Sequence, residues 1–459
     1  MAKAKTAFVC EDCGSEFSKW QGQCSDCKAW NTLTRISIGS ATPNTSPAVQ
    51  ADFRRQGYAG QLSNVQDLSE IDVAAVPRFS SSMGEFDRVL GGGLVPGSVI
   101  LIGGNPGAGK STLLLQVMCT LAQLMPAMYV TGEESLQQVG MRAHRLGLPE
   151  KNLKMLAETA VETICRLAEE LQPKLLVVDS IQVMHSSDVA SAPGSVSQVR
   201  ECAAYLIRYA KQTGTVLFLV GHVTKDGSLA GPKVLEHMID CFVMLEGGSD
   251  TRYRTLRGQK NRFGAINELG VFAMTEKGLK EVKNPSAIFL ARTEEESPGS
   301  LVMVLWEGTR PLLVEIQALV DGSQTGSARR LAVGLDQNRL GMLLAVLHRH
   351  GGLFMADQDV YVNVVGGVKV TETGADLAVL LSIVSSFRDC ALPHDLVVFG
   401  EVGLAGEIRP VPSGQERLQE AAKHGFKRAI VPKANCPKHA VPGMEIIGVS
   451  KLSEALAAL

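Results

Sequence analysis

Residues 104–112, GNPGAGKST, have the types and spacing that hold a triphosphate. They fit the pattern G-x-x-x-x-G-K-[ST], and they lie between the apolar run SVILI and a helix-like stretch, the context that this motif requires. Backbone N–H groups of the glycine-rich loop can surround phosphate oxygens, and the helix N-terminus adds a favourable field. Lys110 is expected to reach the β- and γ-phosphates, and Ser111 to ligate Mg²⁺. The predicted nucleotide-contacting residues are Gly104, Asn105, Pro106, Gly107, Ala108, Gly109, Lys110, Ser111 and Thr112.

Polar side chains also follow three later apolar runs. Asp179 ends LLVVD and is expected to join Ser111 in the Mg²⁺ shell. Glu133 and Glu134 follow AMYVTG, where a carboxylate could polarise the attacking water, or both could cap the next helix. The position of Glu133 relative to the strand end favours it as the catalytic residue. His222 follows VLFLVG and is either a γ-phosphate sensor or a hydrogen-bonded structural residue.

The start of the chain has the spacing of a zinc site. Two C-x-x-C pairs supply four thiolates, from Cys10, Cys13, Cys24 and Cys27. Four thiolates close a tetrahedral Zn²⁺ site without an open position, and a redox role is the alternative for such pairs. Trp20 and Trp30 are expected to pack inside this small module.

A strip of five cations occupies residues 252–262, namely Arg252, Arg254, Arg257, Lys260 and Arg262. A solvated strand face is one interpretation. Lys260 and Arg262 are two residues apart, so on a strand they point the same way. Such a pair could stabilise transferring phosphoryl charge when a neighbouring subunit lends it, which would make both residues catalytic. Alternatively Arg252, Arg254, Lys260 and Arg262 could contact a nucleic-acid backbone.

The elements that position these residues follow from the hydrophobic pattern. Between residues 67 and 285, short apolar runs alternate with amphipathic stretches, which predicts an α/β domain with a parallel sheet covered by helices. Antiparallel strands are expected at the sheet edge, around residues 252–281. Residues 286–459 mix strands with two helices and predict a separate α+β domain. Residues 1–30 form the zinc module, and residues 31–66 have the composition of a linker.

Composition excludes several classes of protein. A chain of 459 residues with 45% hydrophobic and 20% charged residues is expected to form two or three globular domains. The formal net charge of −2 means that nucleic-acid binding must depend on a local patch. Neither a membrane span nor a signal core is predicted, so we expect a cytoplasmic protein.

Taken in order, the four-cysteine start with KWQGQCSDCKAWNT, the loop GGNPGAGKST, the KNRFG segment at 260–264 and the late α+β domain resemble the bacterial RadA (Sms) family of DNA repair proteins. KNRFG is specific to that family, whereas the phosphate loop is not. The resemblance implies a RecA-like ATPase core between a zinc module and a Lon-protease-like domain, with ATP, Mg²⁺ and Zn²⁺ as cofactors. It also implies a homo-hexameric ring that works with RecA recombinase on single-stranded DNA and branched recombination intermediates, driving branch migration.

The resemblance further implies a loop facing the DNA, with Lys225 and Lys233 as contacts. In the Lon-like domain, Ala375 stands at the place of the nucleophile, and Gln415 or Glu416 at the place of the lysine base. None of these can perform Lon-type proteolysis, so the domain is expected to be a scaffold. Two alternatives stay open: an ATP-dependent protein-remodelling machine, and a regulatory ATPase that docks through its zinc module.

Overall fold

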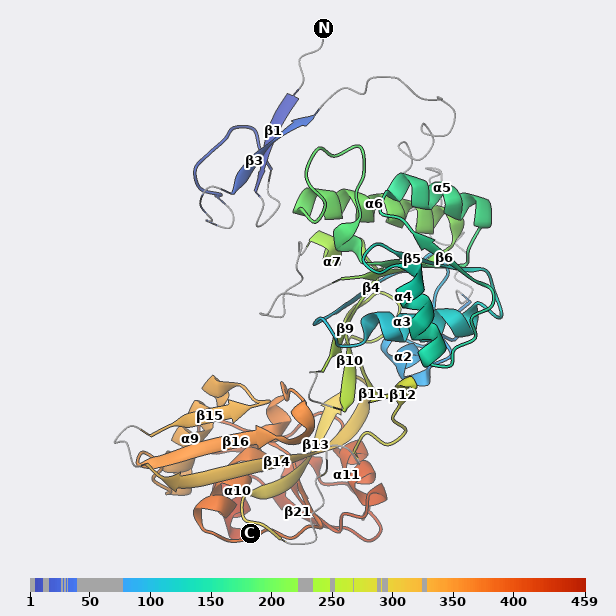
Figure 1. Ribbon diagram of the computed structural model, residues 1–459. Helices are drawn as coiled ribbons and strands as arrows, with labels where there is room; N and C mark the ends of the chain where they lie inside the picture. The colour runs from blue at the N-terminus through green and yellow to red at the C-terminus, as the bar shows by residue number, and fades with distance from the viewer. Residues whose placement is uncertain are drawn as a thin grey trace, which may run out of the picture. The chain divides into compact units, whose positions relative to one another are not determined.

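The computed structural model describes residues 5–10, 16–25, 28, 30, 32–38, 77–221, 234–247, 252–266, 268–286, 290, 296–323 and 328–459. The chain divides into two compact units, Met1–Val282 and Lys283–Leu459 (Figure 1). Within these described ranges, no helix combines the length and the apolar character that a membrane crossing demands.

The first unit begins with a small three-stranded sheet in the order β2-β1-β3. Its strands are β1 (Lys5–Cys10), β2 (Glu16–Phe17) and β3 (Leu33–Ile38). Cys10 and Cys24 are fully buried and cluster with Leu33, and Phe8 and Phe17 pack against them. The core of this module is therefore built around thiols.

The expectation that Trp20 and Trp30 pack inside the module is wrong. Their side chains are 58% and 70% exposed. The module is too small to enclose two indoles in addition to its cysteine cluster, so the large rings remain at its surface.

A nine-stranded sheet forms the centre of the unit, in the order β12-β11-β10-β9-β4-β8-β7-β5-β6. Six neighbouring strands are parallel: β4 (Val99–Gly104), β5 (Ala127–Thr131), β6 (Leu153–Ala157), β7 (Leu175–Asp179), β8 (Val216–Val220) and β9 (Cys241–Glu246). Three antiparallel strands extend one edge, as predicted: β10 (Tyr253–Asn261), β11 (Leu269–Thr275) and β12 (Gly278–Glu281).

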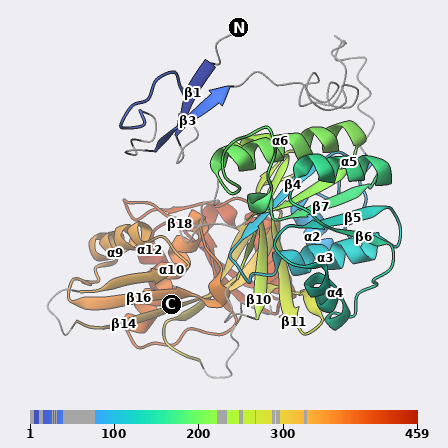
Figure 2. The same cartoon turned by 45° about the horizontal axis from the view of Figure 1, so that its top comes forward.

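Helices cover both faces of this sheet (Figure 2). One face carries α2 (Gly84–Val89) and α3 (Lys110–Leu121), with α4 (Leu136–Arg145) packed beside α3. The other face carries α5 (Val161–Leu171), α6 (Val196–Thr213) and α7 (Val234–Met238). The central strands β4, β5, β7, β8 and β9 are almost entirely apolar because both of their sides are buried, as parallel strands between two layers of helices require. The edge strand β6 is only partly buried.

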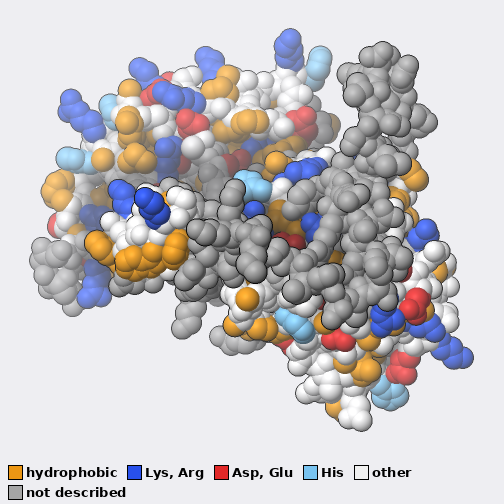
Figure 3. Space-filling model, turned by 90° about the horizontal axis from the view of Figure 1, so that it is seen from above, with side chains coloured by type: hydrophobic (Ala, Val, Ile, Leu, Met, Phe, Trp, Pro, Cys, Tyr) orange, Lys and Arg blue, Asp and Glu red, His pale blue; other side chains and the backbone are white. Residues whose placement is uncertain are grey.

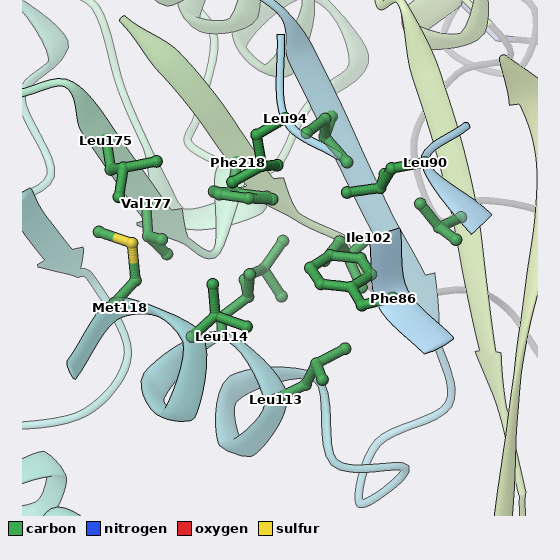
Figure 4. Packing of buried hydrophobic residues seen from close by; sticks show 14 of the residues in the cluster. Phe86, Leu90, Leu94, Ile102, Leu113, Leu114, Met118, Leu175, Val177 and Phe218 are labelled. Atoms are coloured by element: carbon green, nitrogen blue, oxygen red, sulfur yellow. The ribbon is translucent and has the colours of Figure 1, made fainter. Parts of the chain in front are cut away.

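The core beneath α3 fixes the helix that follows the phosphate loop. Figure 4 shows Leu114 and Met118 of α3 directed at strand residues such as Val177. Phe86 of α2 stacks on Phe218 of β8, with ring centroids 6.2 Å apart. This packing holds the N-terminus of α3 at the end of β4.

The second unit has a seven-stranded sheet in the order β15-β16-β14-β13-β17-β20-β21. Its strands are β13 (Ser300–Glu307), β14 (Arg310–Gly322), β15 (Arg330–Val333), β16 (Gln358–Val364), β17 (Leu396–Val398), β20 (Arg428–Pro432) and β21 (Glu445–Val449), with a separate pair, β18 (Glu401–Val402) and β19 (Ile408–Arg409). The two predicted helices are present as α10 (Asp376–Phe387) and α11 (Gly414–Lys423). Two more helices, α9 (Gln337–Gly351) and α12 (Leu452–Ala457), were not predicted.

The KNRFG segment is locked onto the turn that precedes β4. Asn261 Nδ2 donates to the Val89 carbonyl (3.3 Å), and Asn261 Oδ1 accepts from the Phe263 amide (2.8 Å). The backbones of Gly264 and Gly91 touch, since a Cβ built on Gly264 would stand 2.7 Å from Gly91 Cα. A side chain at residue 264 is therefore excluded.

We expect Gly264→Ala to destabilise the first unit by about 1–3 kcal/mol, because the added methyl group must push two backbones apart. Its thermal unfolding should shift down by several degrees. Gly140→Ala is the matched control, because residue 140 lies in α4 with nothing within 4 Å of the place that a methyl group would take, and this variant should gain up to about 1 kcal/mol. Equal melting curves for the two variants would contradict the packing argument.

Candidate nucleotide-binding site

The loop between β4 and α3 has the backbone that a phosphate cradle needs. Gly107 (φ +79°) and Gly109 (φ +108°) adopt the left-handed region that glycine reaches without strain. Gly109 is the N-cap of α3, and Lys110 is its first residue. The first turn of a helix has N–H groups without partners inside the helix, which makes this helix end suitable for an anion.

Lys110 is buried, with 5% of its surface exposed. Its Nζ donates to the carbonyl oxygens of Gly104 (2.7 Å) and Asn105 (3.0 Å). Burial lowers the pKa of this ammonium, while the charges of Asp179 and Glu133 act in the opposite direction. The cation is thus held inside the loop with two carboxylates close enough to stabilise its charge.

Asp179 sits at the end of β7 and is hydrogen-bonded to two hydroxyl groups. The Tyr129 hydroxyl donates to Asp179 Oδ2 (2.6 Å), and Ser111 also bonds to this side chain. Burial raises the pKa of the Asp179 carboxyl, and these two hydrogen bonds counteract the rise. Ser111 and Asp179, the two predicted Mg²⁺ ligands, are therefore in contact. Tyr129 was not predicted, because the sequence shows only a tyrosine within the run AMYVT and not the pairing of β5 with β7.

Glu133 and Glu134 lie in different surroundings. The Ser180 hydroxyl donates to Glu133 Oε1, which fixes that carboxylate beside the end of β7. Glu134 Oε1 accepts from Arg142 Nη2 of α4 (2.5 Å). Glu134 therefore pairs with a residue of α4, whereas Glu133 lies beside Asp179 at the candidate site.

The parallel strand order explains why these residues meet. β4, β5 and β7 all run the same way, and Thr131 of β5 is in register with Asp179 of β7. Their carboxyl ends share one sheet edge, where ligands bind in such folds. The structure thus brings together Lys110, Ser111, Glu133 and Asp179.

The prediction that Arg254 contacts DNA is wrong, because this side chain is buried. The side chain is only 4% exposed, and its Nε donates to the carbonyl of Ala108 in the phosphate loop (3.1 Å). Arg254 Nη1 also donates to Tyr253 O (2.9 Å). Arg254 therefore supports the loop from behind. Arg252, two residues earlier, is exposed as expected.

Lys260 and Arg262 lie at the opposite edge of the sheet from the phosphate loop. Along β9, Cys241 pairs with Asn261 and Leu245 pairs with Gly104. At 3.3 Å per residue, these two positions are roughly 13 Å apart. The cations are therefore outside the nucleotide site of their own chain.

Both cations hold the segment that follows α7. Lys260 Nζ donates to the carbonyls of Glu236 and Ile239, and burial, with the nearby Arg262 charge, lowers its pKa. Arg262 Nη1 pairs with Asp240 Oδ1 (3.3 Å). The pair thus shares one face, as the sequence predicted, and that face contacts the 236–240 segment.

Several predicted residues lie outside the described ranges. These are His222, Lys225 and Lys233 in the segment before α7, and Cys13 and Cys27 in the first module. Their partners Cys10 and Cys24 are buried in one cluster, and a buried pair of thiols from two C-x-x-C motifs suits a closed zinc site.

Three family models match the chain. The model described as AAA domain covers residues 76–228, the rubredoxin metal binding domain covers residues 8–35, and subunit ChlI of Mg-chelatase covers residues 340–435. The chain therefore carries an ATPase domain behind a small metal-binding module. The predicted fold class is confirmed: a RecA-like α/β core, with a zinc module before it and an α+β Lon-like domain after it.

Full-length relatives carry one name. The chain is 70% identical to "DNA repair protein RadA" of Escherichia coli K12 over 459 residues, which covers 99% of both chains. It is 69% identical to the protein of that name from Haemophilus influenzae, covering 100% of this chain and 99% of the relative. The Bacillus subtilis protein of that name is 48% identical, with 99% of each chain covered.

Replacing Arg254 tests its support of the phosphate loop. Arg254→Gln leaves the buried Ala108 carbonyl without its donor, which costs about 1–3 kcal/mol. We expect KM for ATP to rise roughly tenfold while kcat changes less. Arg252→Gln is the matched control and should keep the parent KM. A lowered melting temperature with unchanged KM would show that Arg254 only stabilises the sheet.

The Tyr129 hydrogen bond gives a pH prediction. Tyr129→Phe removes a donor that lowers the pKa of Asp179, so that pKa should rise further. In the pH profile of kcat/KM for ATP, the acidic limb should then shift to higher pH by roughly half to one unit. Tyr209→Phe alters another buried tyrosine, in α6, and should leave this limb in place. An unshifted limb in Tyr129→Phe would refute the role of the bond.

Proposed function

The chain belongs to the RadA family of DNA repair proteins, and from this premise we propose that it is a DNA-dependent ATPase that assembles into a homo-hexameric ring. In this proposal the ring moves on single-stranded DNA and drives branch migration of recombination intermediates together with RecA recombinase. The observation that carries the proposal is the separation of the cation pair Lys260 and Arg262 from the phosphate loop of the same chain.

The convergent edge of the sheet supports ATP hydrolysis. Lys110 and the loop amides would bind the phosphates, and Ser111 with Asp179 would hold Mg²⁺, which shields phosphate charge when bound. Glu133 would orient and polarise the attacking water, because it is tethered beside Asp179 while Glu134 is paired with Arg142.

A second copy of the chain would complete this site. Lys260 and Arg262 are out of reach of their own triphosphate, so a part in hydrolysis requires that they face the nucleotide of a neighbour. Cations supplied in this way stabilise the charge of the transferring phosphoryl group. A closed ring gives every site one such neighbour.

The same pair would couple hydrolysis to DNA. α7 begins at Val234, one residue after Lys233, and Lys260 binds carbonyl oxygens of Glu236 and Ile239 at the end of this helix. Any displacement of α7 by DNA held at Lys225 and Lys233 would therefore move the cations. His222 would sense whether the γ-phosphate is present and transmit this to the segment before α7. The exposed Arg252 would add a contact to the DNA backbone.

The Lon-like domain would be a scaffold and not a protease. Ala375 is fully buried and has no nucleophile. On α11, next to Gln415 and Glu416, Arg417 is fully buried and pairs with Glu372 (2.7 Å). Arg417 is thus committed to an internal ion pair. The second candidate, a protein-remodelling or regulatory ATPase, would likewise use the domain for assembly.

DNA dependence separates the two candidates. Single-stranded DNA should raise the rate of ATP hydrolysis, with binding that weakens steeply as salt increases. Lys110→Ala should lower kcat by about 100-fold or more, because it removes the buried phosphate contact. Hydrolysis that ignores DNA, together with no salt-sensitive DNA binding, would leave only the remodelling or regulatory ATPase.

Subunit mixing tests the lent cations. Lys110→Ala and Lys260→Ala proteins should each be nearly inactive. Mixed assemblies should recover part of the hydrolysis, because an intact loop in one subunit meets an intact Lys260 from the next. Mixing Lys260→Ala with the double variant Lys110→Ala/Lys260→Ala is the control and should recover nothing. If mixed rings form but the first mixture recovers no hydrolysis, the cations of one subunit do not act at the nucleotide of the next.

A further inference from the structure

The first module exposes two of the three tryptophans in the chain. Trp20 is 58% and Trp30 70% exposed, whereas Trp306 of the second unit lies against Arg417, whose Cζ is 5.9 Å from its ring centroid. Tryptophan is highly buried on average and is enriched where a protein surface meets a partner, so two exposed indoles mark a candidate binding surface.

The two indoles lie at the same place. A Cβ built on Gly22 would stand 3.8 Å from Trp30 Cζ3 and 3.9 Å from Trp20 Cη2, so both rings border a residue without a side chain. A bridge between Gln23 and Trp30 fixes the backbone, and Gln23 Nε2 donates to the carbonyl of Lys28 (2.8 Å). The pair is thus held in position by the local backbone.

The described residues close to the two tryptophans in the sequence are mostly polar or charged. Lys19 and Lys28 are exposed, and Gln21 and Gln23 are half-buried. The core of a protein–protein interface is depleted of charged residues and favours apolar neighbours, which this pair lacks. Flat rings beside lysines fit a ligand with flat apolar faces and a negative backbone, which describes a single-stranded nucleic acid.

A local site of this kind is needed on this protein. Figure 3 shows blue and red side chains interspersed over the face toward the viewer, and the formal net charge is −2. General attraction therefore contributes little to DNA binding, and affinity must come from specific groupings of cations and rings.

We propose that Trp20 and Trp30 form a stacking site for bases of single-stranded DNA, with Lys19 and Lys28 contacting the phosphates. The choice of polymer rests on the proposed function, but the site belongs to a different part of the chain from Lys225, Lys233 and the 260–262 cations. Through this site the zinc module would bind single-stranded DNA directly.

Intrinsic fluorescence tests this site in the full-length protein. In a Trp306→Phe background, Trp20 and Trp30 are the only indoles. A thymidine homopolymer of about 20 nucleotides exceeds the roughly 4–16 nucleotides of typical single-strand sites. We expect it to quench the indole emission in a saturable, salt-sensitive manner. If Trp306→Phe fails to fold, the Trp20→Phe/Trp30→Phe protein reports Trp306 alone and gives the same information by subtraction.

Substitution of the rings separates stacking from mere apolar contact. Trp20→Leu and Trp30→Leu should each weaken oligonucleotide binding about 5- to 150-fold, as loss of one stacked base does, whereas Trp→Phe should retain more. Leu124→Ser is the control, because it removes a 77% exposed apolar side chain elsewhere and should change nothing.

The outcomes separate this proposal from the proposed function. If the oligonucleotide binds by fluorescence anisotropy but the indole emission stays constant, the stacking site is refuted and DNA binding survives. If the Leu variants bind as tightly as the parent, the rings do not stack on bases, and the proposal is again overturned. If the oligonucleotide does not bind at all, the proposed DNA-dependent function itself fails.

Discussion

The burial of the Lys110 ammonium is the interaction on which the first unit depends. A buried charge is costly unless polar groups and opposite charges surround it. Here two loop carbonyls accept hydrogen bonds from the ammonium, and Asp179 and Glu133 supply negative charge. Those carboxylates come from the ends of β7 and β5, so the compensation exists only when three parallel strands end at one edge. The packing of α3 on the sheet then keeps the loop closed around the cation.

A second buried charge organises the opposite edge. Asp240 is 3% exposed and accepts from the Val99 amide (3.0 Å), from Lys211 and from Arg262. Val99 is the first residue of β4, and Gly104 at its other end begins the phosphate loop. One short strand therefore joins the nucleotide site to the cation pair of the KNRFG segment. In the proposed ring, β4 would connect the nucleotide site of one chain with the cations, Lys260 and Arg262, that this chain places at the nucleotide of its neighbour.

The sequence predicted the site where local pattern was sufficient. A phosphate-loop motif after an apolar run, and carboxylates after two later runs, determine their positions once the strands are parallel. The role of Arg254 depended on which face of β10 is buried. Side chains alternate along a strand, so Arg254 lies on the same side of β10 as Leu256 and Gly258, and this alternation can be read from the sequence. The bulge between Gly258 and Lys260 cannot be read from it. For α9, the sequence does contain the signals of a helix, namely the N-cap Asp336 and the spacing of the leucines that are buried.

The exposure of Trp20 and Trp30 could not be predicted in the same way. Large apolar rings in a small module suggest a core, and only the three-dimensional packing shows that thiols already fill it. Likewise the sequence shows a strip of five cations but not that its members serve three different partners: the phosphate loop, α7 and solvent. Such differences arise from tertiary contacts between segments that are far apart in the chain.

The central claim, that each nucleotide site is completed by a neighbouring copy, is tested most directly by a structure of the assembled protein. The assembly should contain Mg²⁺, a non-hydrolysable ATP analogue and single-stranded DNA. If lent cations complete each site, Lys260 or Arg262 nitrogen atoms of one copy should lie within about 4 Å of the γ-phosphate oxygens held by the next, the range of an ion pair. Every 260–262 segment facing solvent, away from nucleotide and from other copies, would contradict it.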